Sequence, residues 1–120
     1  MNNNYYEERP WGSFENLLDT DYCKVKRIIV KPGQRLSYQF HYKRSEAWVV
    51  VQGEAVATLD DVATTYKVGE VIIVPVGTKH RVENRQDEDL KFIEVQTGTY
   101  FGEDDIVRLE DDYGREGTND

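Results

Sequence analysis

The 120-residue sequence has only one cysteine, Cys23, and two histidines, His41 and His80. A single cysteine excludes an internal disulfide and gives no sign of an oxidising compartment. We expect Cys23 to be a half-buried strand residue, because it lies in the alternating run YCKVKRIIV. Any site that is built on imidazole nitrogens must use these two histidines.

Positive charge is also scarce, with 15 Lys and Arg against 23 Asp and Glu, which gives a net charge of -8 and a pI near 4.8. General attraction to nucleic acid or to an anionic membrane depends on summed positive potential and is therefore excluded. An anionic ligand needs a local cluster of Lys and Arg. The sequence also lacks an apolar signal segment and any run near the ~20 apolar residues of a membrane span. We therefore predict a cytoplasmic protein.

The length fits one domain, since ~100–150 residues is the commonest domain size. The polar ends predict a flexible N-terminal lead-in over residues 1–8 and a flexible C-terminal tail over 116–120. The domain itself is expected to span 9–115. No linker divides it.

Short apolar or alternating runs dominate the chain and are separated by turn sequences such as PG, QG and LDD. The runs are VKRIIV (25–30), RLSYQF (35–40), EAWVVVQ (46–52), EAVATL (54–59), TTYKV (64–68), VIIVP (71–75), HRVEN (80–84) and LKFIEVQTG (90–98). They predict an all-β fold, with a double-sheet jelly roll favoured among sandwiches and barrels. A short helix is expected around ENLLD (15–19), and DDIVRLEDDY (104–113) fits either a last strand or a helical turn.

The two histidines occur beside other possible metal ligands. Gln39 and His41 are two apart on a predicted strand and so share a face, and Glu46 opens the next strand. His80, beyond the PVGT corner, completes a set of two nitrogens and two oxygens. Such a set suits one divalent ion of Zn, Co, Mn, Ni or Fe better than Ca²⁺ or Mg²⁺. A lone strand histidine is nevertheless more often an ordinary polar residue than a ligand.

The sequence resembles the cupin superfamily at both of its motifs. The second motif, G-x5-P-x-G-x2-H-x3-N, is matched by Gly69, Pro75, Gly77, His80 and Asn84. The first motif is matched by Gly33, Gln39 in place of a histidine, His41, Glu46 and Gly53. This resemblance implies a small double-stranded β-helix, or jelly-roll barrel, with a metal inside it.

A narrower resemblance covers residues 9–115. RPWGSFE, VKRIIVKPGQRLSYQFHYKRSEAWVVVQGEA, PVGTKHRVEN and IEVQTGTYFGEDDIVRLEDDYGR are similar to the C-terminal isomerase region of type II phosphomannose isomerases. This implies a free-standing isomerase unit that interconverts mannose 6-phosphate and fructose 6-phosphate through a cis-enediol, with Gln39, His41, Glu46 and His80 as metal ligands. The chain departs from the family's HHHRAEHW pattern, because Tyr42, Lys43 and Ala47 stand where histidines are common.

Roles for the remaining residues follow from this resemblance. The phosphate is expected to bind Arg44 and Lys43, with Arg35 and Arg108 as weaker candidates. Lys43 could equally be a solvent-exposed residue of a hairpin turn. Glu94 is the candidate base, although it could equally form a structural ion pair. The candidate catalytic residues are Arg44, Lys43 and Glu94. Trp11 and Trp48 are expected to be core or interface residues rather than platforms on which a sugar stacks. A homodimer is implied by analogy with similar cupins.

Three other readings stay open at this point. The chain could be a non-catalytic cupin that binds a metal and a sugar phosphate and assists a separate guanylyltransferase, which the altered HYKRSEA corner favours. It could be another cupin enzyme, either an Fe²⁺ dioxygenase, against which Gln39 counts, or an isomerase or epimerase of a nucleotide-linked sugar. A metal-free structural domain would require the four ligand types to coincide by accident.

Overall fold

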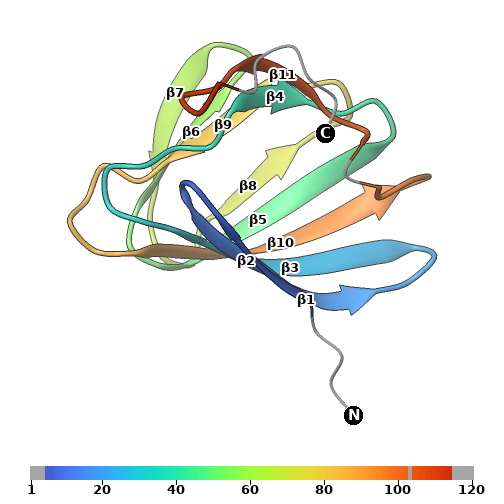
Figure 1. The fold of residues 1–120 in the computed structure, drawn as a ribbon, viewed down its shortest axis with the longest axis horizontal. Coiled ribbons are helices and arrows are strands. Elements are labelled where there is room, and N and C mark those ends of the chain that lie inside the picture. The colour runs from blue at the N-terminus through green and yellow to red at the C-terminus, as the bar shows by residue number, and fades with distance from the viewer. Residues whose placement is uncertain (1–4, 103, 115–120) are drawn as a thin grey trace.

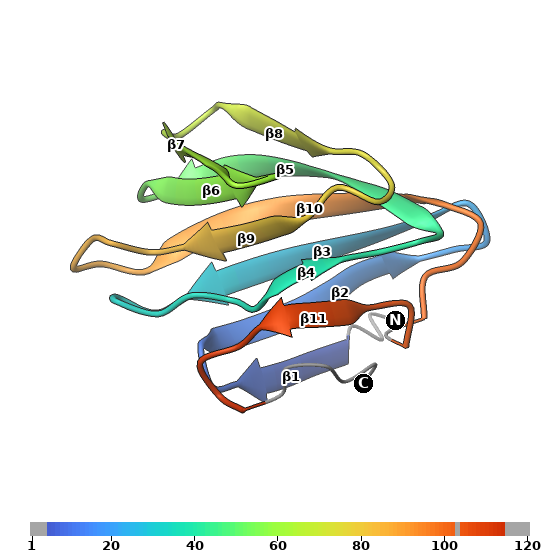
Figure 2. The same ribbon diagram turned by 90° about the horizontal axis from the view of Figure 1, so that it is seen from above.

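A computed structural model describes residues 5–102 and 104–114, and this part of the chain contains eleven strands and no helix. They are β1 Tyr5–Arg9, β2 Gly12–Asp19, β3 Cys23–Val30, β4 Tyr38–Phe40, β5 Arg44–Gln52, β6 Ala55–Leu59, β7 Val62–Tyr66, β8 Val71–Val74, β9 His80–Glu83, β10 Leu90–Gly98 and β11 Val107–Glu110. The six-stranded sheet has the order β1-β2-β3-β10-β5-β8, and the five-stranded sheet has the order β11-β4-β9-β6-β7. All pairs are antiparallel. The two sheets face each other, which confirms the predicted all-β jelly-roll architecture (Figures 1 and 2).

The core lies between the sheets because the long strands alternate strictly. In β5 and β10 every second residue is buried, as expected when successive side chains point to opposite faces. Trp48 and Phe92 project inward from the six-stranded sheet and stack with ring centroids 5.4 Å apart. Ala57 and Val82 meet them from the other sheet. The prediction that Trp48 and Trp11 are core residues is confirmed, since both are buried.

The expected N-terminal lead-in includes a strand. Residues 5–9 form β1, which pairs with β2 from Tyr5 opposite Asn16 to Arg9 opposite Gly12. Two strand-favouring tyrosines and a close turn at Pro10 and Trp11 explain this pairing. Residues 1–4 of the lead-in and the expected tail at 116–120 lie outside the described residues.

The helix that was predicted around ENLLD is wrong, because residues 15–19 belong to β2. The segment pairs with β3 along its length, apart from an irregularity between Asn16 and Leu18, and its first two residues also pair with β1. A five-residue helix has no comparable support, since isolated short helices are marginal. The ambiguous segment 104–113 contains the strand β11, paired with β4. No helix in the described part of the chain has the length and hydrophobicity needed to cross a membrane.

The two motif corners are tied together by one hydrogen bond. Gly77 has φ = 80°, a left-handed conformation that favours glycine, and its N–H donates to the carbonyl oxygen of His41 at 2.9 Å. Thr78 N–H closes the turn onto the Pro75 carbonyl at 3.1 Å. This corner therefore sets the start of β9, at His80, beside the end of β4.

Candidate metal centre and the cavity beside it

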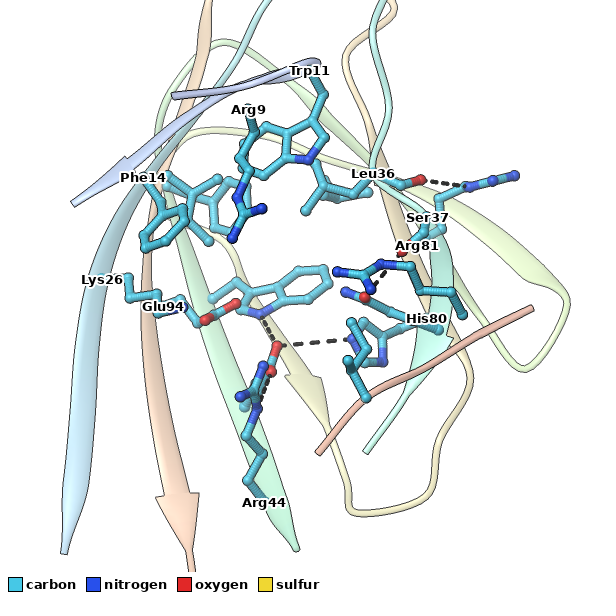
Figure 3. A pocket seen from close by; sticks show the side chains of 18 residues that line it. Arg9, Trp11, Phe14, Lys26, Leu36, Ser37, Arg44, His80, Arg81 and Glu94 are labelled. Carbon is cyan, nitrogen blue, oxygen red and sulfur yellow. Dashed lines mark hydrogen bonds and ion pairs between the residues drawn. The ribbon is translucent and has the colours of Figure 1, made fainter. Parts of the chain in front are cut away.

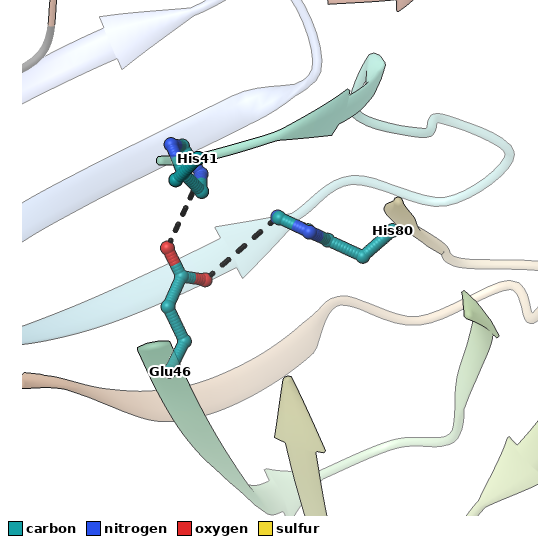
Figure 4. A group of neighbouring side chains, drawn as sticks. All are labelled: His41, Glu46 and His80. Atoms are coloured by element: carbon teal, nitrogen blue, oxygen red, sulfur yellow. Dashed lines mark ion pairs between the residues drawn. The ribbon is translucent and has the colours of Figure 1, made fainter. Parts of the chain in front are cut away.

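Three buried side chains bring possible ligand atoms together inside the barrel: His41, Glu46 and His80. Glu46 lies on the inward face of β5, His80 opens β9, and His41 directly follows β4. The three ligand atoms lie within 4.8 Å of one another. Glu46 Oε2 is 3.4 Å from His41 Nε2, and Glu46 Oε1 is 3.9 Å from His80 Nε2. Figure 4 shows the carboxylate between the two rings.

Backbone carbonyls determine which nitrogen of each ring faces the carboxylate. His41 Nδ1 donates to the carbonyl oxygen of Asp105, and His80 Nδ1 donates to that of Thr78 at 3.0 Å. A carbonyl oxygen only accepts, so each neutral ring carries its hydrogen on Nδ1 and its lone pair on Nε2. Both lone pairs are therefore directed toward Glu46, the orientation that such partners give to metal-binding imidazoles.

The surroundings keep this group as two neutral rings and one carboxylate. Burial lowers the pKa of His41 to about 4, although Glu46 opposes this shift, and burial also lowers the pKa of His80. Burial alone would raise the pKa of Glu46, but the charge of the nearby Arg44 guanidinium holds it below its usual value. Metal ions bind neutral imidazole and ionised carboxylate. The group therefore fits a divalent metal ion in ligand type and protonation.

Gln39 stands opposite His80 in the β4–β9 pair. Directly opposed residues of an antiparallel pair place their side chains on the same face, so the Gln39 amide is beside the His80 ring. Ser37 Oγ donates to Gln39 Oε1 at 3.0 Å, and both side chains line the adjoining cavity. The structure thus places Gln39 opposite His80 and in the lining of the same cavity.

Glu46 is held from two sides by neighbours on its own strand. Arg44 Nε donates to Glu46 Oε2 at 2.9 Å, and Trp48 Nε1 donates to Glu46 Oε1 at 3.0 Å. Arg44 Nη2 also lies 3.2 Å from His41 Nε2. Arg44 therefore binds the same carboxylate oxygen and the same ring nitrogen that a metal ion would use.

A cavity of about 80 Å³ opens beside this group. Five of its lining side chains are cationic and two are carboxylates, although the whole chain carries a net charge of -8. The cationic residues are Arg9, Lys26, Arg44, Arg81 and Arg108, and the carboxylates are Glu46 and Glu94. Figure 3 shows Arg44 at one end of the cavity and Arg9 and Trp11 at the other. The cavity thus has the local positive cluster that an anionic ligand requires.

Two of the four predicted phosphate-binding residues do not reach this cavity. Lys43 is exposed, with Nζ 5.1 Å from the ring centroid of Tyr100. Arg35 points to the outside, where it forms a two-point ion pair with Asp112 at 2.7 and 2.8 Å. Lys43 points away from the cavity because it is next to the inward-facing Arg44. Neighbouring residues of an extended chain point to opposite faces. Arg44 and Arg108 do line the cavity.

Glu94 also lines the cavity, from the inward face of β10. Burial, reinforced by the nearby charge of Glu46, raises the pKa of Glu94 to about 8. Gln96 Nε2 donates to Glu94 Oε2 at 2.7 Å. A buried carboxyl group that is largely protonated near neutral pH is suited to proton transfer.

Sequence reasoning missed three cationic residues of the cavity: Arg9, Lys26 and Arg81. Lys26 had a readable signal, because the alternation of VKRIIV places it on the same face as Ile28 and Val30. Arg81 follows His80, yet its guanidinium bonds the Leu36 carbonyl at 2.9 Å. For Arg9 no local pattern indicated a site, since it depends on the pairing of β1 with β2.

Comparison with known proteins identifies a matching family and several relatives. The sequence profile of the family described as "Mannose-6-phosphate isomerase C-terminal" matches residues 2–111. The chain is 47% identical over 107 residues to the alginate biosynthesis protein AlgA of Pseudomonas aeruginosa and 46% identical to the mannose-1-phosphate guanylyltransferase of Escherichia coli K12. These matches cover 89% of this chain but only 22% of each relative. The chain therefore spans less than a quarter of the length of these relatives.

A solved structure supports the fold. A Klebsiella pneumoniae protein described as having a double-stranded β-helix domain matches with a TM-score of 0.70 and 24% identity, over 78% of this chain and 79% of that one. Together with the two facing antiparallel sheets, this match confirms the predicted cupin fold class.

The names of the relatives contradict one prediction. The sequence analysis assigned the chain as a mannose-6-phosphate isomerase, whereas close relatives are named mannose-1-phosphate guanylyltransferase. The two reactions differ, because one transfers a guanylyl group and the other moves a proton within a hexose phosphate. Motif matching supports an isomerase-like cupin domain but carries no information about which reaction is retained, which is why the enzyme assignment went wrong.

Proposed function

Because this chain belongs to the family described as mannose-6-phosphate isomerase, C-terminal, we propose that it is a cupin domain that binds one divalent metal ion and, beside it, a sugar phosphate. The proposed ligands are Gln39, His41, Glu46 and His80. Zn, Co, Mn, Ni and Fe fit such a mixed set of nitrogen and oxygen donors. When bound, the metal would polarise an oxygen of the sugar.

The proposal of a metal ion rests mainly on an unfavourable contact between two hydrogen-bond acceptors. His80 Nε2 is buried and has no hydrogen-bond partner among the described residues, and it faces Glu46 Oε1 at 3.9 Å. A lone pair and a carboxylate oxygen repel each other, and a buried acceptor without a partner is costly. The lowered pKa of His80 disfavours a proton in this position. A metal ion would accept the lone pair of His80 Nε2 and would be attracted by the negative charge of Glu46.

The sugar phosphate is inferred from the charge of the cavity and from the pathway of a relative. An excess of cationic side chains around a small enclosed space favours an anion. AlgA is named for alginate biosynthesis, and another relative for mannose-1-phosphate guanylyltransferase. A cupin that binds a hexose phosphate beside such a transferase suits the supply of precursors for polysaccharides.

Elemental analysis combined with calorimetry tests this function. The wild type is expected to hold one metal ion per chain and to bind mannose 6-phosphate only when metal is present. His80→Ala should lose the metal, whereas Glu83→Gln should keep it, because Glu83 lies on the same strand but pairs outward with Arg85. A wild type that remains metal-free after incubation with each candidate ion would contradict the proposal.

Glu94 favours a second candidate function, an enzyme that transfers a proton to or from another sugar substrate. Its carboxyl group is buried in the cavity and its raised pKa suits an acid–base role. Incubating sugar phosphates and nucleotide-linked sugars in D₂O would detect the reaction as deuterium incorporated at a sugar carbon, measured by NMR. Glu94→Gln should stop this incorporation while leaving metal content unchanged. Absence of incorporation in the wild type would leave binding as the function.

We also propose that two copies pair through the outer face of the six-stranded sheet. Rows of apolar residues cross three of its strands in register: Val95, Ala47 and Ile73 in one row, and Ile93, Val49 and Val71 in the next. Ile73 and Val71 are 60% and 49% exposed. The 43 residues of these six strands, at ~3.3 Å rise and ~4.8 Å spacing, give a face of roughly 680 Å². A stable dimer buries about 800 Å² per partner, so the interface would have to use the whole face and its edges.

Light scattering measures the mass of this assembly directly. The wild type should have the mass of a dimer, and Ile73→Lys should give a monomer because it places a charge in the apolar rows. Val62→Lys is the matched control, since Val62 is 66% exposed on β7 at the edge of the other sheet. A monomeric wild type, or a dimer that survives Ile73→Lys, would refute this interface.

A further inference from the structure

Two cationic side chains contact one aromatic ring in the wall of the cavity, away from Arg44. Lys26 Nζ lies 4.3 Å from the ring centroid of Phe14, and Arg9 Cζ lies 5.4 Å from the same centroid. The three residues come from neighbouring strands, β1, β2 and β3. Figure 3 shows the Arg9 guanidinium reaching into the cavity and Lys26 on its side wall.

Each of these two cations already has an acidic neighbour. The Lys26 residue is only 5% exposed, and its positive charge opposes the rise in the pKa of Glu94, which lines the same cavity. Arg9 pairs with Glu7 on its own strand at 2.6 Å, and 31% of the Arg9 side chain is exposed. A guanidinium has five N–H donors and an ammonium has three, so the two side chains together can bind several oxygens of an anion.

The position of this pair also matches a ligand that extends along the cavity. The metal group lies near Arg44, and Arg9 marks the opposite end. Trp48 and Phe92 line the space as well. A ligand with a sugar near the metal group and a phosphate at its far end would meet neutral rings in the middle and cations at the end.

We propose that Arg9 and Lys26 form the phosphate subsite of the cavity, with a sugar phosphate oriented so that its phosphate points away from the metal group. This inference rests on the proposed function. It replaces Lys43 and Arg35 as phosphate holders, because neither lines the cavity. Phe14 acts as the platform that holds the two cations at a fixed spacing.

Calorimetric titration with inorganic phosphate, mannose 6-phosphate and mannose tests the subsite on the intact, metal-loaded chain. Lys26→Met keeps the apolar stem of the buried side chain, and Arg9→Gln changes a partly exposed one. Each variant should weaken phosphate and mannose 6-phosphate at least tenfold, with mannose affinity and metal content unchanged. Lys43→Gln, the matched control outside the cavity, should change affinity less than twofold. Thermal melts report whether Lys26→Met still folds, and Arg9→Gln does not depend on that result.

The outcomes separate this subsite from the proposed function. If mannose 6-phosphate binds the wild type and both variants equally, the subsite is overturned and the proposed function stands. If inorganic phosphate binds in a way that depends on Arg9 and Lys26 but mannose 6-phosphate does not bind, the subsite stands and the sugar phosphate is wrong. If neither ligand binds the wild type, both proposals fail.

Discussion

Replacing Asn84 by alanine should destabilise the barrel by about 4 kcal/mol. Asn84 is buried, and its Nδ2 donates to the carbonyl oxygens of Val30 at 2.8 Å and Glu88 at 2.7 Å. Its Oδ1 accepts from Gln86 N–H at 2.9 Å. Val30 is fully buried, so losing the hydrogen bond to its carbonyl costs about 2 kcal/mol, whereas exposed Gln86 and Glu88 can turn to water and lose about 1 kcal/mol each.

Urea unfolding, followed by the fluorescence of the buried Trp11 and Trp48, measures this loss. For a chain of this size the change corresponds to a fall in Tm of roughly 15 °C. Gln86→Ala is the control and should cost less than about 0.5 kcal/mol, because its side chain is exposed. A cost below about 1 kcal/mol for Asn84→Ala would refute the reasoning. Loss of metal without loss of stability would instead mean that Asn84 acts at the metal centre.

Three further predictions follow from the same structure. Arg44→Gln should tighten metal binding about tenfold in a chelator competition, because a cation 2.9 Å from the proposed ligand Glu46 opposes a second one; weaker binding would show that Arg44 instead orders the carboxylate. In metal-free protein, the lowered pKa values of His41 and His80 give stability that is present above pH 6.5 and lost as pH falls toward 4, by roughly 3 kcal/mol for His41 alone; a urea series that shows no fall over this window would contradict it. Gly98→Ala should cost about 3 kcal/mol or more in the same assay, because the new Cβ would lie 2.2 Å from the Lys43 carbonyl oxygen; an unchanged midpoint would mean that the backbone there can move.

The fold class and the closeness of His41, Glu46 and His80 could be predicted from the sequence for a physical reason, and metal binding by these residues stays a prediction. Strand alternation is a local property, so inward and outward positions of β5 and β10 can be counted along the chain. The corner before His80 is also local, since it depends on Pro75 and Gly77. The sequence could not predict which side chains from different strands lie close together. Arg9 and Lys26 contact the same Phe14 ring because β1, β2 and β3 pair side by side. Arg35 points outward, where it forms an ion pair with Asp112, a residue far away in the sequence.

The three residues that stand in place of histidines of the HHHRAEHW pattern do not face the cavity. Tyr42 is 64% exposed, Lys43 is exposed, and Ala47 points outward between Val95 and Ile73. Exchanging histidines at these three positions therefore changes the outer surface of the barrel and leaves the cavity lining as it is. Ala47 instead extends the apolar rows of the proposed dimer face, where a histidine would introduce a polar ring. The departure thus bears on the proposed dimer face, whereas Arg44, Glu46 and Glu94 all face inward and line the cavity.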